Sequence, residues 1–133
     1  EYGLNDPNLY LEFAERCNRH ALNMNRLLNQ LKLAGSTVYG YGASTKGNVL
    51  LQYANIGSEL ISGIAEVNPD KFGKFTPGSN LPIFDEKDLN SISDRDYFLV
   101  LPWHFKDFIL KKETGKLQHG AHFIFPFPSI SIY

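Results

Sequence analysis

Apolar residues recur at spacings of three and four through the N-terminal part of the chain, which places them on one stripe of an amphipathic helix. We predict that this helix begins near Pro7, ends at Gly35 and packs one face against the rest of the protein. Cys17 is expected to be a small core residue, and the asparagines on the other faces are expected to be solvated. The stripe comprises Leu9, Phe13, Cys17, Ala21, Met24, Leu28 and Leu31, and the asparagines are Asn18, Asn23, Asn25 and Asn29.

Short runs of β-branched, aromatic and aliphatic residues follow this helix and predict strands at 36–41, 60–67, 97–101, 122–125 and 130–133. Helical patterns at 47–55 and 105–113 alternate with them, which predicts right-handed βαβ crossovers. The expected fold is therefore α/β, with a Rossmann-like, mostly parallel sheet flanked by helices and preceded by the long N-terminal helix. The stretch 68–86 is rich in proline and glycine, and we expect an ordered loop there.

Composition narrows the class of protein. A chain of 133 residues suits one core, so we expect a single compact domain in which the helix of residues 1–35 packs on or links to a Rossmann-like part at 36–133. The net charge of -1, with dispersed charges, argues against nucleic-acid binding. The single cysteine excludes an intramolecular disulfide, and no apolar run is long enough to span a membrane, so we expect a cytoplasmic protein. Because the chain begins at Glu1 without a methionine, we expect it to be a piece of a longer enzyme.

The segment Gly40 to Asn48, with the sequence GYGASTKGN, joins a predicted strand to a predicted helix. Glycines permit a tight turn with positive φ, and the first N–H groups of a helix favour an anion by about 0.3 to 1 kcal/mol. The side chains of Ser44, Thr45 and Lys46 add donors at the same point. The segment therefore predicts a phosphate site, with a turn that binds nothing as the alternative.

Neither standard phosphate-loop pattern is complete in this segment. The Walker pattern fails because its lysine and hydroxyl positions hold Asn48 and Val49, which excludes a nucleotide triphosphatase of that type. The dinucleotide pattern fails at its third glycine, which is Thr45, and Glu66 lies further on than the usual ribose-binding acid. A nicotinamide or flavin site has only weak support.

Ligands of open parallel sheets bind beyond the carboxyl ends of the strands. We expect three segments to meet there, namely the glycine turn, the loop 66–78 and the segment 102–105. Lysines would offer charge to a diphosphate, and aromatic side chains would offer flat surfaces to a base or sugar. The candidates are Lys46, Lys71, Lys74, Phe75 and Trp103.

Each candidate has a structural alternative. Lys71 and Lys74 would then be solvated loop lysines. Asn68 would cap a β-turn, and Glu66 would cap neighbouring N–H groups. Trp103 would be a core residue, and His104 would be structural rather than an acid or base. The other histidines show no metal-ligand spacing, and no catalytic triad or paired-carboxylate motif is present. We infer a chain that binds a ligand without a catalytic apparatus of its own.

Several motifs in one order carry a resemblance over nearly the whole chain. They are VYGYGASTKGN at 38–48, NPDK at 68–71, Gly73, TPG at 76–78, LPI at 81–83 and LVLPWH at 99–104. This set resembles the C-terminal domain of the S-adenosylmethionine-dependent sugar C-methyltransferases.

The resemblance implies a role in binding a nucleotide-diphosphate 4-keto deoxysugar, with thymidine diphosphate as the expected carrier. S-adenosylmethionine and the base that removes a proton beside the ketone would belong to an upstream methyltransferase domain, and zinc to a domain further upstream. Residues 68–78 and 102–104 would flank the sugar nucleotide. The phosphate-facing turn would comprise Gly40, Gly42, Ala43, Ser44, Thr45, Lys46, Gly47 and Asn48. A free-standing Rossmann-like module that binds a nucleotide or dinucleotide is the alternative.

Overall fold

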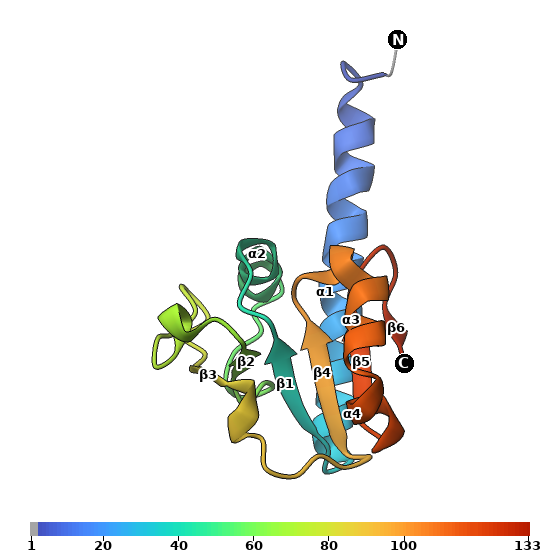
Figure 1. The fold of residues 1–133 in the computed structure, drawn as a ribbon. Helices are drawn as coiled ribbons and strands as arrows, with labels where there is room; N and C mark the ends of the chain where they lie inside the picture. The colour runs from blue at the N-terminus through green and yellow to red at the C-terminus, as the bar shows by residue number, and fades with distance from the viewer. Residues whose placement is uncertain (1–2) are drawn as a thin grey trace.

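The computed structural model of the protein describes residues 3–133, in which a long helix precedes alternating strands and helices (Figure 1). The α-helices are α1 (Pro7–Leu33), α2 (Thr45–Tyr53), α3 (Lys106–Lys112) and α4 (Thr114–Gln118). The strands are β1 (Thr37–Tyr41), β2 (Ile64–Glu66), β3 (Ile83–Asp85), β4 (Asp96–Val100), β5 (His122–Phe125) and β6 (Ser131–Ile132). Short 3-10 turns are η1 (Pro69–Lys71), η2 (Glu86–Asp88) and η3 (Trp103–Phe105). None of the helices within residues 3–133 combines the length and apolar character needed to cross a membrane.

The strands form one six-stranded sheet in the order β3-β2-β1-β4-β5-β6. All neighbours pair in parallel except β5 and β6, which are antiparallel. The chain moves outward from β1 to β2 and β3, then returns to β4 on the other side of β1. This is the strand order of doubly wound Rossmann-like folds, so the expected α/β class and mostly parallel sheet are confirmed.

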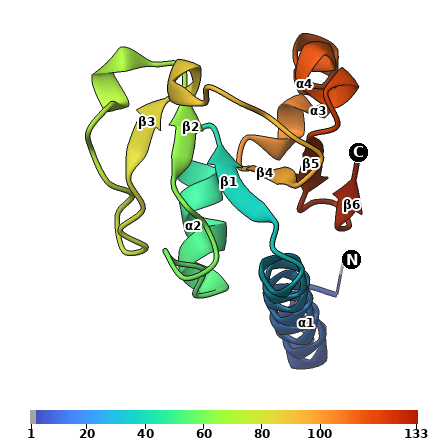
Figure 2. The same ribbon diagram turned by 90° about the horizontal axis from the view of Figure 1, so that it is seen from below.

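Helices cover both faces of the sheet, with α1 and α2 on one face and α3 and α4 on the other (Figure 2). Alternate residues along β1 and β4 therefore enter different cores. The core under α1 and α2 includes Met24, Leu28, Val38, Leu51, Ile64, Leu99 and Ile124. The core under α3 and α4 includes Tyr41, Phe98, Val100, Ile109, Phe123 and Phe125.

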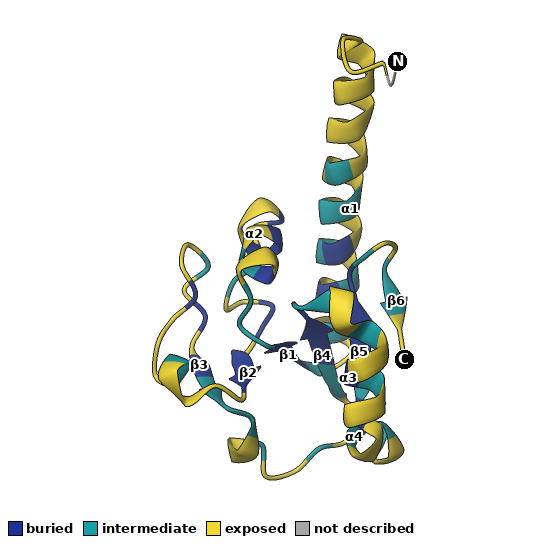
Figure 3. Ribbon diagram, turned by 45° about the horizontal axis from the view of Figure 1, so that its top comes forward, coloured by how far each residue is buried: buried dark blue, intermediate teal, exposed yellow. Residues whose placement is uncertain are grey.

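Helix α1 begins and ends where its local sequence signals indicate. Asp6 caps it by accepting a hydrogen bond from the Asn8 N–H at 2.9 Å, Pro7 occupies the first turn, and Gly35 follows the last turn with φ +79°. The expected burial of its whole stripe is wrong, however. Only the C-terminal half lies against the sheet, and the first half projects into solvent (Figure 3).

Other expectations need correction because they depend on partners distant in sequence. Asn25 is not merely solvated, since its Nδ2 donates to the Ala54 carbonyl at 2.6 Å, and Asn18 accepts from the Tyr53 hydroxyl at 2.7 Å. Cys17 is only half-buried. Within the expected loop 68–86 the chain forms the edge strand β3. Strand β2 is shorter than the strand predicted at 60–67, because only Ile64–Glu66 pair with a neighbouring strand.

Two glycines of the 40–48 segment are required by close packing. A Cβ at Gly40 would lie 2.3 Å from Ile64 Cδ1, and one at Gly47 would lie 2.2 Å from Leu101 Cβ. Gly42 differs, because its φ of +76° turns the chain out of β1. The glycines therefore seat α2 directly on the sheet beside β4.

We expect Gly47→Ala to destabilise the fold by about 1 to 3 kcal/mol, because the new methyl group overlaps Leu101. Gly115→Ala is the matched control, since Gly115 is also helical and its Cβ would meet nothing within 4 Å. The control should be neutral or stabilise by up to about 1 kcal/mol. Urea denaturation measures the free energy of unfolding of both variants. Equal values for Gly47→Ala and Gly115→Ala would show that Leu101 moves aside for the new methyl group without loss of stability.

Candidate functional site

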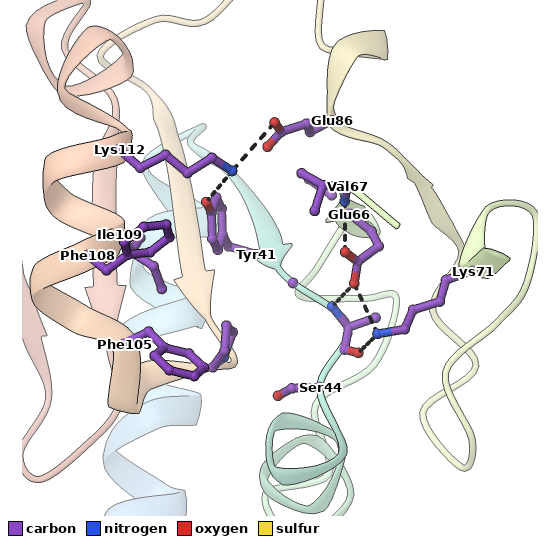
Figure 4. Close-up of a pocket in the computed structure, with 14 residues that line it drawn as sticks. Tyr41, Ser44, Glu66, Val67, Lys71, Glu86, Phe105, Phe108, Ile109 and Lys112 are labelled. Atoms are coloured by element: carbon purple, nitrogen blue, oxygen red, sulfur yellow. Dashed lines mark hydrogen bonds and ion pairs between the residues drawn. The ribbon is translucent and has the colours of Figure 1, made fainter. Parts of the chain in front are cut away.

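A cavity of about 550 Å³ opens at the carboxyl ends of β1, β2 and β4, where the strand order reverses (Figure 4). One wall comes from α3 and the turn before it, and the other from the residues after β2. Most of the lining is apolar, with Val67, Pro102, Phe105, Phe108 and Ile109 as its main contributors. This switch point is where doubly wound sheets bind ligands, and we refer to the space as the main cavity.

The carboxylate of Glu66 fixes the floor of the main cavity. Its Oε1 accepts from the N–H groups of Val67 at 2.8 Å and Asn68 at 3.1 Å, and its Oε2 accepts from the Ala43 N–H at 2.8 Å. Lys71 lies 3.4 Å from Oε2 and donates to the Ala43 carbonyl at 2.7 Å. The end of β2 is thereby tied to the glycine turn after β1.

These contacts occupy the carboxylate that would bind a ribose in a dinucleotide domain. Burial raises the pKa of Glu66, but the backbone donors and Lys71 outweigh burial and hold the pKa below its ordinary value. Glu66 is therefore an ionised structural cap, which was the alternative considered from sequence. A dinucleotide whose ribose bound to Glu66 would have to displace these backbone hydrogen bonds.

A second polar cluster closes the opposite side of the main cavity and was not found from the sequence. The Tyr41 hydroxyl donates to Glu113 Oε1 at 2.7 Å, and Glu113 also pairs with Lys112 at 3.4 Å and with Lys116. Glu86 lies 3.9 Å from Lys112 and 3.6 Å from Lys116. Charges of both signs thus alternate from η2 to α3 and α4.

Protonation states in this cluster follow from burial and neighbours. Burial and the hydrogen bond to Glu113 raise the pKa of Tyr41 far above its ordinary range, so the hydroxyl remains a donor. Burial also raises the pKa of Glu113, but the hydrogen bonds from Lys116 and Tyr41 and the lysine charges lower it further than burial raises it. At neutral pH the Tyr41 hydroxyl is therefore protonated and the Glu113 carboxylate ionised, and their hydrogen bond joins the end of β1 to the junction of α3 and α4.

A smaller cavity of about 210 Å³ adjoins the main cavity and shares Ala43, Ser44 and Lys71 with it. It lies over the first turn of α2, where Ser44 Oγ accepts from the Gly47 N–H at 3.0 Å. No acceptor among the described residues is recorded for the N–H groups of Thr45 and Lys46. The Oδ1 atom of Asn48, which is buried, also has no recorded partner among them.

The structure brings together only some of the residues selected from sequence. Those that line one or both cavities are Gly42, Ala43, Ser44, Thr45, Asn48, Glu66 and Lys71. Gly40 and Gly47 lie in the packing between β1, α2 and β4. Lys46 is exposed on α2.

The remaining candidates lie outside both cavities. Asn68 caps η1 by accepting from the Asp70 N–H at 3.0 Å, which is the turn considered as its alternative. Lys74 is exposed in the loop before β3. Trp103 packs against Phe127 with ring centroids 4.8 Å apart, and the exposed ring of His104 lies against Phe105.

Phe105 lies in the segment 102–105 that was expected at this edge, but Phe108, Ile109 and Lys112 were missed although they share a readable signal. They stand at i+3, i+4 and i+7 from Phe105, which is one face of a helix. Because that helix follows β4, this face borders the carboxyl edge of the sheet. Within residues 3–133, no group of three or more histidine, cysteine or acidic side chains is placed to hold a metal ion.

Comparison with known proteins settles the family. A family model described as "C-methyltransferase C-terminal domain" matches residues 1–128. The chain belongs to this family. It is also 35% identical over 127 residues to the C-methyltransferase NovU of Streptomyces niveus. That alignment covers 95% of this chain but only 30% of NovU, so the chain spans less than a third of the length of this relative.

Both buried carboxylates should make the fold sensitive to acid. Their pKa values are lower in the folded state than the ordinary value of 4.5, so their stabilisation is complete above that value and is lost as pH falls through the folded-state pKa. We expect Glu113→Gln to lower the free energy of unfolding by about 2 kcal/mol at pH 7 and by less at pH 3.

Denaturant titrations at pH 7, 5 and 3 test this expectation. Glu12→Gln, at an exposed position of α1, is the control and should follow the unsubstituted protein at every pH. A constant difference between Glu113→Gln and the unsubstituted protein across the range would contradict the proposed contribution of the ionised carboxylate.

Proposed function

We propose that this domain binds the sugar substrate of an S-adenosylmethionine-dependent C-methyltransferase, as a nucleotide-diphosphate 4-keto deoxysugar. The observation that carries the proposal is the main cavity, which lies at the switch point of a domain of this family and is largely apolar. Its lysines, Lys71 and Lys112, are offset by Glu66 and Glu86. A cavity with balanced charge and apolar walls suits an uncharged ring of a deoxysugar or a base.

The diphosphate would lie beside this ring, over the first turn of α2. The N–H groups of Thr45 and Lys46, the Ser44 hydroxyl and the Lys46 ammonium offer donors there, and the helix dipole favours an anion. Lys71 lies between the two cavities, so it would contact a ligand that spans both. The Asn48 oxygen would accept a hydrogen bond from a ligand hydroxyl.

The methyl donor would bind elsewhere in the full-length enzyme. S-adenosylmethionine carries a ribose and no phosphate, and the Glu66 carboxylate that would engage a ribose is occupied by backbone donors. We therefore assign S-adenosylmethionine and the proton-abstracting base to an upstream domain, and zinc to a domain further upstream. This domain would orient the sugar so that the carbon beside its ketone meets the methyl group.

Calorimetric titration of the chain tests the division of roles. We expect thymidine diphosphate and its 4-keto sugar to bind with a saturable signal, in a titration extended to millimolar concentration, and S-adenosylmethionine to give none. The full-length enzyme should bind both ligands. Saturable binding of S-adenosylmethionine by this domain, without a response to sugar nucleotides, would reverse the assignment.

The exposed Lys46 offers a test that leaves the fold intact. A charge-assisted hydrogen bond contributes about 1.5 to 3 kcal/mol, so we expect Lys46→Ala to weaken thymidine-diphosphate binding about ten- to a hundredfold, with an unchanged melting temperature. Lys74→Ala is the matched control, because Lys74 is also exposed but lies in the loop before β3 rather than in the first turn of α2. Equal Kd values for the two variants would exclude Lys46 from the diphosphate site.

A further inference from the structure

One face of α1 continues beyond the sheet without a covering element among residues 3–133 (Figure 3). Leu9, Tyr10 and Phe13 lie on this face and are 43%, 54% and 59% exposed. By helical periodicity they continue the face that carries Met24 and Leu28, which are fully buried in the core. We refer to Leu9, Tyr10 and Phe13 as the free stripe.

The free stripe projects past the edge of the sheet at which the cavities lie. A helix of 27 residues is about 40 Å long, whereas a strand of five residues spans about 17 Å. Only residues 34–36 connect α1 to β1, and the two elements run in opposite directions. The N-terminal half of α1 therefore extends beyond the carboxyl end of β1 (Figure 1).

We propose that the free stripe is the docking surface for the methyltransferase domain that precedes this domain in the full-length protein. The family is defined as a C-terminal domain, and the chain accounts for 30% of the length of its relative NovU. Preceding chain would thus enter at the N-terminal end of α1, next to the free stripe. Only the identity of this partner rests on the proposed function.

The free stripe is better suited to a linked domain than to a second copy of the chain. Three partly exposed apolar side chains offer limited area, which is a weak basis for association between separate molecules. A covalently linked domain reaches an effective concentration of about millimolar, at which the same area is sufficient. Two residues of opposite charge, Glu12 and Arg16, border the free stripe on α1, with the Arg16 guanidinium 5.8 Å from the centre of the Phe13 ring, and suit the polar rim of such an interface.

Docking at the free stripe has a consequence for the ligand. A domain held there would lie beyond the carboxyl edge of β1, on the side toward which the strands point. The sugar presented in the main cavity would then meet the methyl donor between two domains. α1 would act as the element that sets their separation.

Hydrogen–deuterium exchange of the full-length protein and of this chain alone tests the docking directly. We expect the amides of residues 9–17 to exchange at least tenfold more slowly in the full-length protein, with no such change for residues 24–33. Equal exchange in both proteins would overturn the proposal. Sedimentation that shows the full-length protein as a dimer, with protection of residues 9–17 lost on dilution to monomer, would overturn it in favour of a second copy.

Substitutions on opposite faces of α1 provide the matched comparison. Phe13→Asp places a charge in the free stripe, whereas Leu11→Asp places one about 200° round the helix at a residue of similar exposure, 63% against 59%. In the full-length protein we expect Phe13→Asp to remove the protection of residues 9–17 and to lower kcat/KM for methyl transfer about tenfold. Leu11→Asp should leave both within twofold.

The isolated chain separates this proposal from the proposed function. Phe13→Asp should not change its melting temperature or its Kd for thymidine diphosphate, because Phe13 lies outside both cavities. If the full-length protein bound no sugar nucleotide, the proposed function would be wrong. The hydrogen–deuterium exchange comparison would still show whether a preceding domain docks on the free stripe. If both substitutions removed the protection equally, the free stripe would not be the interface.

Discussion

The Glu66 carboxylate holds together the segments on which the site depends. It accepts backbone hydrogen bonds from the ends of two neighbouring strands and pairs with Lys71 of η1. An ionised carboxylate satisfied by three N–H groups is a rigid joint, because each bond to a charged acceptor is stronger than a neutral one. The floor of the main cavity is therefore fixed before any ligand arrives.

A second constraint, from the cluster around Glu113, fixes the opposite wall. Tyr41 at the end of β1 is joined through Glu113 to α3 and α4, and Glu86 extends the cluster to η2. Removal of one member would leave buried charge without compensation, which costs far more than the net contribution of the intact cluster. Both walls of the main cavity thus use balanced ion pairs, so the cavity itself presents little net charge to a ligand.

Much of the fold could be predicted from the sequence because its signals are local. The cap at Asp6 and the glycine after α1 mark the helix ends, and apolar runs mark most strands. The Tyr41–Glu113 bond, between residues 72 apart in sequence, has no local signal. Strand β3 was missed because three residues in a loop-like stretch become a strand only by pairing with β2. Helical periodicity identified the apolar stripe of α1, but it carries no information on how far along the helix the sheet continues to cover that stripe.

The candidate site likewise could be predicted where strand order determines it, but not where it depends on side-chain packing. The expected meeting of the glycine turn, the loop after β2 and the segment 102–105 at the carboxyl edge is confirmed, because strand order alone determines which strand ends are neighbours. The side chains that fill that edge depend on packing, so Trp103 turns to Phe127 while Phe105 borders the cavity. Both carboxylates that line the main cavity are held in ion pairs, Glu66 with Lys71 and Glu86 with Lys112 and Lys116. Under the proposed function, this domain would contribute shape and position to the reaction, and the reactive groups would come from the upstream domain.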